Sequence, residues 1–252
     1  FHPSRNKEEE ELVSKMRERI TQGKTGKKIF FWNNRNARRK QSGTLIWWFK
    51  EWLDKVGHNK AMLLMHTDPR DPHGQDLPHL IEHLGLDEGQ VLLSTTKVNP
   101  QELANLYRAA DYTINISDAE GFGLATLESL SCETPIVVNM TGGLQEQVTD
   151  GKEWFGIGIE PSSKAVIGSM SVPYIYEDRV NEDDFVDAMV KMYDMSPKER
   201  AKLGKKGRAH VAKNYNFDNF KSTWVDTMTE IHEDNGSWET RKNYNSWESI
   251  EL

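Results

Sequence analysis

Six short apolar segments recur along the chain, separated by longer segments with helical periodicity. They are Lys28–Asn33, Ala61–His66, Val91–Ser94, Tyr112–Ile116, Pro135–Asn139 and Phe155–Ile159. Runs of this length that are apolar throughout are typical of strands buried on both faces of a parallel sheet. The sequence therefore predicts an α/β fold, a doubly wound parallel sheet of about six strands with helices on both faces.

The segments between the apolar runs repeat apolar residues every three or four positions. The predicted helices are Lys7–Gln22, Gly43–Val56, Leu77–Leu84, Gln101–Ala110, one beginning near Phe122, one from Gly142-Gly143 to Thr149, Glu182–Tyr193, Pro197–Lys213 and Phe217–Glu233. Segment Ser162–Arg179 has no clear period, so it is predicted to be a loop with at most one short strand. We expect one domain over residues 1–233 and a tail over 234–252.

Composition narrows the function classes. The 252 residues carry a net charge of −7, which argues against nucleic acid or an anionic membrane as the main partner. A single cysteine, Cys132, excludes an internal disulfide framework and favours a reducing, cytoplasmic location. No apolar run approaches 18 residues, so no transmembrane segment is expected.

The segment Asp118–Cys132 carries the strongest candidate site. A loop with Glu120 and two glycines leads into a helix with Glu128. If that helix begins near Phe122, Glu128 lies about 9 Å along its axis, and both carboxylates can address one ligand lying across its N-terminus. The free N–H groups there favour an anion. A sugar–diphosphate–ribose compound would suit this combination.

A structural interpretation of the same segment is an amphipathic helix with an acidic first turn. Glu128 lies four residues from both Leu124 and Cys132, which places it on or beside a core-facing stripe. Acids at such positions are uncommon unless they are paired or functional. These residues alone leave both interpretations open.

A basic cluster follows the first predicted strand. Four positive side chains fall within Arg35–Lys40, and Arg35 and Lys40 are five apart. Positive charge there would neutralise a diphosphate, although such clusters are more often solvated loops. This loop, Thr95–Asn99 and Ser117–Gly123 all follow strands, at the sheet edge where α/β proteins bind ligands. Gly142 and Gly143 follow another strand and would let backbone approach a ligand.

No metal site is predicted. His79 and His83 are four apart on a predicted helix, a spacing that can bind zinc, but no further ligand pattern accompanies them. Surface histidines are the simpler interpretation.

Several motifs occur together in a fixed order. They are Phe1-His-Pro, FFWNNRNARRK, LANLYRAAD, EGFGLATLESLSCETPIV and TGGLQEQV. Over residues 1 to about 230 this chain resembles the C-terminal domain of retaining GT-B glycosyltransferases of family 4. The resemblance implies a Rossmann-like domain that forms one half of a GT-B fold. The EGFG element followed by a glutamate after seven intervening residues is its most specific part.

The resemblance also implies site roles. Glu128 corresponds to the acid that binds the donor ribose, Glu120 to the acid that contacts the donor sugar, and Arg35 with Lys40 to the pair that neutralises the diphosphate. Backbone near the donor is expected from Lys97, Val98, Gly121, Phe122, Gly123, Leu124, Gly142 and Gly143. Gln41, Thr96 and Glu133 stand where the family usually has glycine, so the turn after Lys40 and the contacts to the base are the parts that could differ.

The implied reaction is retaining transfer of a hexose-like unit from a UDP-, GDP- or ADP-linked sugar to an acceptor hydroxyl on a glycan, lipid or protein. No cofactor or metal is expected, because cations and the helix N-terminus would stabilise the leaving diphosphate. Family members bind the acceptor in an N-terminal domain, so we expect the chain to begin at the second domain. A non-catalytic nucleotide-sugar binding module and a GT-B-like epimerase remain as alternatives.

The segment after residue 233 has two interpretations. Trp238, Tyr244, Trp247 and Ile250 lie among polar residues. The resemblance implies a tail that crosses to the N-terminal domain, whereas the composition alone also suits a frayed terminus.

Overall fold

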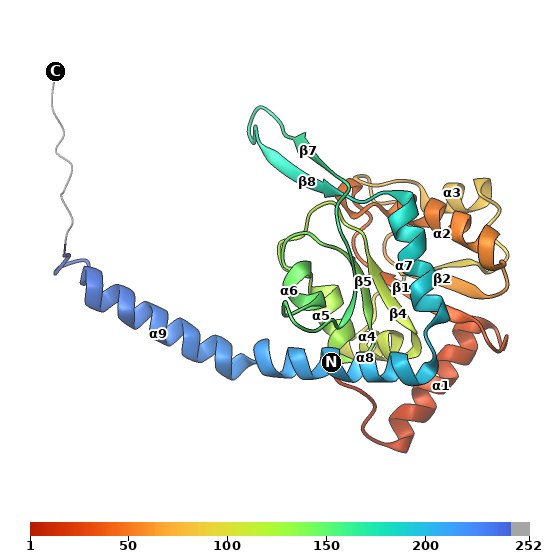
Figure 1. Cartoon of the computed structure of the whole chain (residues 1–252), viewed down its shortest axis with the longest axis horizontal. Helices are drawn as coiled ribbons and strands as arrows, with labels where there is room; N and C mark the ends of the chain where they lie inside the picture. The colour runs from red at the N-terminus through yellow and green to blue at the C-terminus, as the bar shows by residue number, and fades with distance from the viewer. Residues whose placement is uncertain (243–252) are drawn as a thin grey trace. The chain divides into compact units, whose positions relative to one another are not determined.

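The computed structural model describes residues 1–242 and contains a six-stranded, all-parallel sheet with helices on both faces (Figure 1). Its strands are β1 (Lys28–Asn33), β2 (Ala61–His66), β3 (Val91–Ser94), β4 (Tyr112–Asn115), β5 (Ile136–Asn139) and β6 (Gly156–Ile159). The helices are α1 (Lys7–Thr21), the 3-10 turn η1 (Arg38–Lys40), α2 (Ser42–Val56), α3 (Leu77–His83), α4 (Pro100–Ala109), α5 (Leu124–Ser131), α6 (Leu144–Val148), α7 (Glu182–Asp194), α8 (Pro197–Asn214) and α9 (Phe217–Asn235). The predicted fold class is confirmed.

The two faces of the sheet have separate cores. Phe30 and Trp32 of β1 are fully buried on the face covered by α2, α3 and α7. Their neighbours Ile29 and Phe31 are fully buried on the other face, against α1 and α4. Side chains alternate between the faces of a strand, so a strand buried on both sides is apolar at every position.

The order of the strands locates the ligand edge of the sheet. The order is β3-β2-β1-β4-β5-β6, so the connections run outward in opposite directions from β1 and β4. Open α/β sheets bind ligands in the crevice at the carboxyl ends of the strands where the order reverses. The basic loop after β1 and the acidic loop after β4 meet there, and the Asp118 N–H donates to the Arg39 carbonyl at 2.8 Å.

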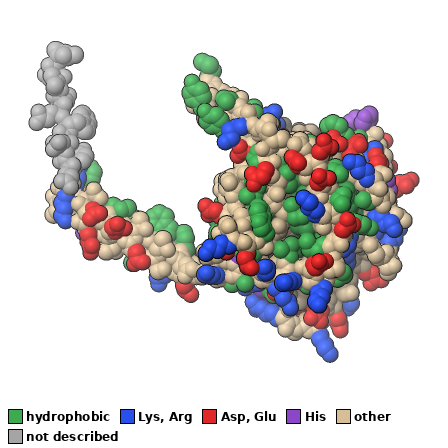
Figure 2. Space-filling model, in the orientation of Figure 1, with side chains coloured by type: hydrophobic (Ala, Val, Ile, Leu, Met, Phe, Trp, Pro, Cys, Tyr) green, Lys and Arg blue, Asp and Glu red, His purple; other side chains and the backbone are tan. Residues whose placement is uncertain are grey.

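The predicted loop Ser162–Arg179 is instead an antiparallel hairpin of two strands, β7 (Ser163–Ile167) and β8 (Ile175–Arg179). The prediction was wrong because a hairpin that projects from the domain need not separate apolar from polar residues. Val166 and Tyr176 are paired in register, yet each is about 60% exposed. Hydrophobic side chains gather at its tip (Figure 2).

The base of the hairpin is fixed to the ligand edge. The Asp178 N–H donates to the Asp118 carbonyl at 2.8 Å, and the Asn139 amide donates to the carbonyls of Ser117 and Asp178. The Arg38 guanidinium, with contacts of 2.5 and 3.1 Å, forms a bidentate pair with the buried Glu177 carboxylate.

The chain divides into two compact units, Phe1–Val211 and Ala212–Leu252. The first unit holds the sheet and every predicted site residue. In the second, α9 exposes an apolar stripe that includes Phe217, Phe220, Trp224 and Ile231. The predicted boundary at residue 233 stays a prediction, as does docking of the tail: Trp238 is 81% exposed, and Tyr244, Trp247 and Ile250 lie outside the described residues.

None of the helices described within residues 1–242 combines the length and the apolar character needed to cross a membrane.

Candidate functional site

A cleft of about 450 Å³ opens at the carboxyl ends of β1 and β4. It brings together six of the predicted site residues: Lys40, Glu120, Phe122, Gly123, Leu124 and Glu128. Asn33, Asn34, Leu103 and Ala125 complete its lining. The two acids that are eight residues apart in the sequence therefore face one cavity.

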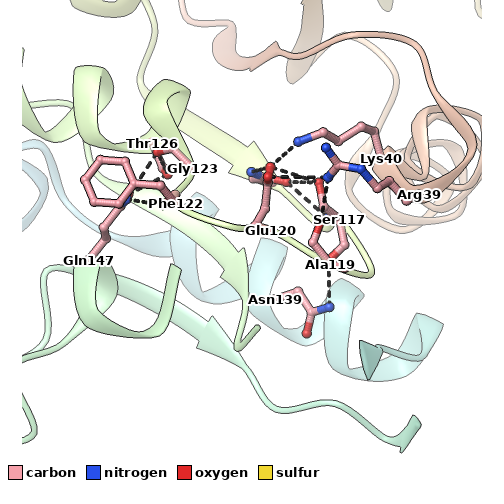
Figure 3. Close-up of polar contacts among 11 residues, drawn as sticks. Arg39, Lys40, Ser117, Ala119, Glu120, Phe122, Gly123, Thr126, Asn139 and Gln147 are labelled. Carbon is pink, nitrogen blue, oxygen red and sulfur yellow. Dashed lines mark hydrogen bonds and ion pairs between the residues drawn. The ribbon is translucent and has the colours of Figure 1, made fainter. Parts of the chain in front are cut away.

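At one end of the cleft, Glu120 is held by charged and polar neighbours, which we call the Glu120 corner (Figure 3). The Lys40 ammonium pairs with Glu120 Oε1, and Arg39 Nη1 lies 3.4 Å from Oε2. Asn115 Nδ2 donates to Oε1 at 3.0 Å, and the Ser117 hydroxyl lies 3.4 Å from the same oxygen. The side chains of Glu120 and Lys40 are 7% and 9% exposed, so the pair is nearly dry.

The protonation of this pair follows from its surroundings. Burial alone would raise the pKa of Glu120, but the hydrogen bonds from Asn115 and Lys40 outweigh burial and hold the pKa below its ordinary value. For Lys40 burial is the larger effect, and it lowers the pKa despite the bond to Glu120. Glu120 is thus a firmly ionised carboxylate.

At the other end, the Glu128 corner consists of Glu128, Tyr107 and Asn33. The Tyr107 hydroxyl donates to Glu128 Oε2 at 2.9 Å and accepts from Asn33 Nδ2 at 2.8 Å. Burial raises the pKa of Glu128, and the bond from Tyr107 only partly opposes that rise. The described residues provide Glu128 with no cationic side chain within ion-pair distance, so a ligand hydroxyl would find an acceptor that lacks a counter-charge.

Helix α5 begins at Leu124, two residues later than predicted, so Glu128 lies about 6 Å along its axis rather than 9 Å. The predicted stripe faces the core at one end only. Cys132, one turn beyond Glu128, is buried, whereas Leu124 is 67% exposed and lines the cleft. Gly123, the N-cap, gives no side-chain cap, so the first N–H groups of α5 face the cleft unshielded.

Gly142 and Gly143 have a role that the sequence did not indicate. A Cβ on Gly142 would lie 1.7 Å from the Glu120 carbonyl oxygen, and one on Gly143 would lie 2.8 Å from the Phe122 carbonyl oxygen. The Gly143 N–H donates to the Gly121 carbonyl at 3.1 Å. The pair allows two backbone loops to touch, and so supports the loop that carries Glu120.

The same loop is supported from α6. Gln147, fully buried, donates through Nε2 to the Phe122 carbonyl at 2.5 Å and lies 3.2 Å from the Gly123 carbonyl (Figure 3). The Thr126 hydroxyl is 2.8 Å from the Gly123 carbonyl and 2.6 Å from Gln147 Oε1. The backbone of Phe122 and Gly123 is therefore held in place before any ligand binds.

Six of the predicted site residues lie outside the cleft lining: Gly142 and Gly143, described above, and Arg35, Lys97, Val98 and Gly121. Arg35 points elsewhere: its guanidinium binds both carboxylate oxygens of Asp71, at 2.6 and 3.1 Å, and lies 2.8 Å from His73 Nδ1. Lys97 is exposed, and Val98 packs against the core on the α1 and α4 side. Gly121 helps to hold the Glu120 loop, because its carbonyl accepts a hydrogen bond from the Gly143 N–H.

Sequence reasoning missed the side chains that position the two acids: Asn33, Arg39, Tyr107, Asn115 and Gln147. Asn33 and Asn115 were recognisable as polar residues that end apolar strands. Tyr107 lies in the LYRAAD motif on α4, and Glu128 lies on α5. Because these two helices meet only in the fold, the bond between the two residues had no local signal.

The cleft can therefore accommodate a ligand that carries both anionic and hydroxyl groups. The α5 N-terminus and Lys40 attract the anion, and the carboxylates accept from hydroxyls. Within residues 1–242 no group of three or more His, Cys, Asp or Glu side chains is placed to hold a metal ion.

Comparison with known proteins gives a consistent result. The family model described as glycosyl transferases group 1 matches residues 14–210. A D-inositol 3-phosphate glycosyltransferase of Arthrobacter sp. (strain FB24) is 30% identical over 136 residues, which are 54% of this chain and 27% of that relative.

Two solved structures share the fold. Sucrose-phosphate synthase from Thermosynechococcus elongatus matches with a TM-score of 0.68 and 20% identity, over 92% of this chain and 50% of that chain. Anabaena Alr3699/HepE in complex with UDP and glucose matches with a TM-score of 0.66 and 15% identity, over 90% and 53%. The chain thus spans about half the length of these structures and about a quarter of the curated relative.

Proposed function

Because the chain belongs to the group 1 glycosyl transferases and corresponds to their C-terminal domain, we propose that its cleft binds the nucleotide-diphosphate sugar donor. The observation that carries this proposal is one cleft that combines two carboxylates, Glu120 and Glu128, with Lys40 and an uncapped helix start. A donor carries the matching groups: sugar hydroxyls, a diphosphate and ribose hydroxyls.

The proposed assignments follow the geometry of the cleft. Glu128 accepts from the ribose hydroxyls, since it is the acid without a cationic partner. Glu120 accepts from hydroxyls of the donor sugar. Lys40 and the N–H groups at the start of α5 bind the diphosphate and stabilise the charge that develops on it as it leaves.

Lys40 is well placed for both tasks. Its ammonium is nearly buried, so the phosphate charge that it meets is weakly screened. Binding of the diphosphate adds a second anionic partner to a lysine whose pKa burial depresses, and so keeps it protonated. Arg35 could contact the diphosphate only by leaving Asp71, so we assign it a secondary role in diphosphate binding.

The finer features of the reaction are part of the proposal. We propose retaining transfer of a hexose-like unit, with Lys40 and the helix N-terminus in place of a divalent metal. The UDP and glucose named for the Anabaena structure support a nucleotide sugar as donor. The acceptor, a glycan, lipid or protein hydroxyl, would approach from an N-terminal domain, since the solved structures are about twice as long. The single buried Cys132 fits the proposed cytoplasmic location.

Calorimetric titration with UDP, GDP and ADP, each with and without Mg²⁺, tests the donor site. At least one nucleotide is expected to bind with a Kd between micromolar and millimolar, and Glu128→Ala is expected to weaken it about 10- to 100-fold, because a hydrogen bond to a charged group is lost. Glu88→Ala, an exposed glutamate in a turn, is the matched control and should bind normally.

Four results would each contradict a part of the proposal. Absence of binding by all three nucleotides, or normal affinity in Glu128→Ala, removes the site assignment. A requirement for Mg²⁺ removes the metal-free role of Lys40. Donor binding without turnover when an N-terminal glycosyltransferase domain is supplied favours the non-catalytic binding module.

A further inference from the structure

A second cavity is lined by Asp118, in the loop that carries Glu120. It has a volume of about 260 Å³ and shares no lining residue with the donor cleft. Its walls come from the start of α2, from the loop after β4 and from the end of β8. Asp118 lines this cavity and Glu120 lines the donor cleft, so two acids of one loop face different cavities.

The buried carboxylate of Asp118 accepts few hydrogen bonds. The residue is 3% exposed, and within the described chain only the Gln41 amide, at 2.5 Å from Oδ2, donates to it. A carboxylate offers about four acceptor positions, and a buried one with a single partner is unusual. Burial raises the pKa of Asp118 accordingly, despite the Gln41 bond.

Arg179 provides unused donors on the same wall. Its side chain is 43% exposed, and among residues 1–242 its guanidinium has one polar contact, with Glu177 at 3.5 Å. In the part of the chain that the structure describes, its Nε–H is buried and has no acceptor. A guanidinium has five N–H groups, so most of them are available to a ligand.

The remaining polar groups are already ordered. The Thr44 hydroxyl donates to Gln41 Oε1 at 2.6 Å, which fixes the amide that donates to Asp118. Trp48 supplies an aromatic wall and is held from behind by Phe185, with ring centroids 5.6 Å apart. The cavity thus combines an acceptor, donors and an aromatic surface in fixed positions.

These features select among ligand classes. An anion is disfavoured by the Asp118 carboxylate, and a metal ion by the guanidinium and by the presence of one carboxylate alone. An apolar ligand would leave Asp118 and Arg179 desolvated without partners. A hydroxyl group can donate to Asp118 and accept from Arg179 at once, and the C–H face of a sugar can pack on Trp48.

We propose that this cavity is a second carbohydrate site, which binds one monosaccharide unit or polyol separately from the donor. Its volume of about 260 Å³ lies just below the range of roughly 300–1,000 Å³ that is usual for ligand pockets, which suits a single ring. The inference does not depend on the donor assignment, because the two cavities have different walls.

Saturation-transfer difference NMR on the whole chain tests the proposal with methyl glycosides of glucose, galactose, mannose and N-acetylglucosamine at millimolar concentration. At least one glycoside should give a signal that persists in excess UDP and in Glu128→Ala. Asp118→Asn and Arg179→Met should each weaken that binding at least fivefold. Trp48→Phe, which keeps a ring against Phe185, should weaken it less and leave UDP affinity unchanged.

The controls separate the possible outcomes. Thr44→Val should weaken glycoside binding, whereas Thr25→Val, an exposed threonine at the opposite end of the sheet, should not. No signal from any glycoside, or normal binding in both Asp118→Asn and Arg179→Met, overturns the proposal. Competition by UDP, or loss of the signal in Glu128→Ala, shows that the sugar sits in the donor cleft and also overturns it. A glycoside signal without nucleotide binding contradicts only the donor assignment.

Discussion

The Glu120 and Glu128 corners place the same functional group in opposite electrostatic environments. Glu120 faces Lys40 and Arg39 and has a pKa below the ordinary value. Glu128 is held by a neutral phenol and has a pKa above the ordinary value. Both are largely buried and both line one cleft.

This difference gives the two carboxylates different roles. A carboxylate that is already paired with a cation stabilises the folded state whether or not a ligand is bound. A carboxylate that is buried without a counter-charge costs stability until a ligand donates to it. The Glu120 corner is therefore expected to respond to mutation mainly in stability, and the Glu128 corner mainly in binding.

Among the variants that test this comparison, Lys40→Met should have the largest effect. Removing one member of a buried ion pair leaves the Glu120 charge without its main partner and should cost about 3 kcal/mol of unfolding free energy. That corresponds to roughly 6–12 °C in Tm for a domain of this size. Thermal unfolding measures it, with exposed Lys24→Met as the matched control.

The double variant Lys40→Met/Glu120→Gln shows whether the loss arises from the unpaired charge. It should recover part of the stability, because the uncompensated carboxylate is gone. If the double variant is less stable than the sum of the single changes, the pair is not the source of the effect.

The next effect concerns the glycine that supports the Glu120 loop. Gly142→Ala places a methyl group against the Glu120 carbonyl, whereas Gly151, which also has a positive φ, has open space around its Cβ position. Both alanines bear the cost of left-handed backbone, so the difference between them isolates the clash. Gly142→Ala should be about 2 kcal/mol less stable than Gly151→Ala in urea unfolding. Equal stabilities would mean that the two loops separate freely.

A smaller effect is expected at the Glu128 corner. Tyr107→Phe keeps the aromatic contact with Phe31 but removes the donor to Glu128. Loss of that bond raises the pKa of Glu128 further, so the carboxylate form declines at a higher pH. Nucleotide affinity should fall about three- to tenfold, and the acidic limb of its pH dependence should move upward.

Calorimetry between pH 5 and 8 measures both changes, and Tyr193→Phe, on α7, serves as the control. An affinity loss with an unchanged pH profile would assign Tyr107 to packing alone.

The smallest expected effect is a gain in stability, opposite in sign to the loss expected for Lys40→Met. Glu128 binds a proton more tightly in the folded than in the unfolded chain, so the native state loses stability as pH rises from the ordinary pKa of Glu through the raised one. Glu128→Gln should therefore be up to about 1 kcal/mol more stable than the parent at pH 7, with the gain absent at pH 4.

Glu120→Gln should behave in the opposite way. The depressed pKa of Glu120 means that its ionised form stabilises the fold above the unfolded pKa, and that this contribution is lost as pH falls through the folded value. Its cost in urea unfolding should thus be largest at pH 7 and shrink in acid. If both substitutions change stability with the same pH trend, the distinction between the corners fails.

The sheet and its ligand edge were predictable because their signals are local. A strand such as Lys28–Asn33 is apolar at every position only if both of its faces are covered, and the loops that follow such strands gather at one edge. The same reasoning brought Lys40, Glu120 and Glu128 into one cleft.

What could not be predicted depends on contacts between distant segments. The bond from Tyr107 to Glu128 spans 21 residues, and Arg35 has its guanidinium on Asp71, 36 residues away. The glycine pair was assigned to ligand approach, yet its close contact is with the Glu120–Phe122 backbone. Each of these needs the register of two elements, which residue spacing along one element does not contain.

The β7–β8 hairpin also bears on how the protein behaves at high concentration. From Ala165 to Tyr176 it has no charged side chain, and charged residues return only at its base, with Lys164 and Glu177. Within residues 1–242 neither of its strands pairs with a strand outside the hairpin. An uncharged, unpaired edge is a surface on which separate chains associate by strand addition. Self-association of intact, folded molecules is therefore expected to begin at this hairpin, and the colloidal behaviour of the protein depends on its tip even though its stability depends on the core.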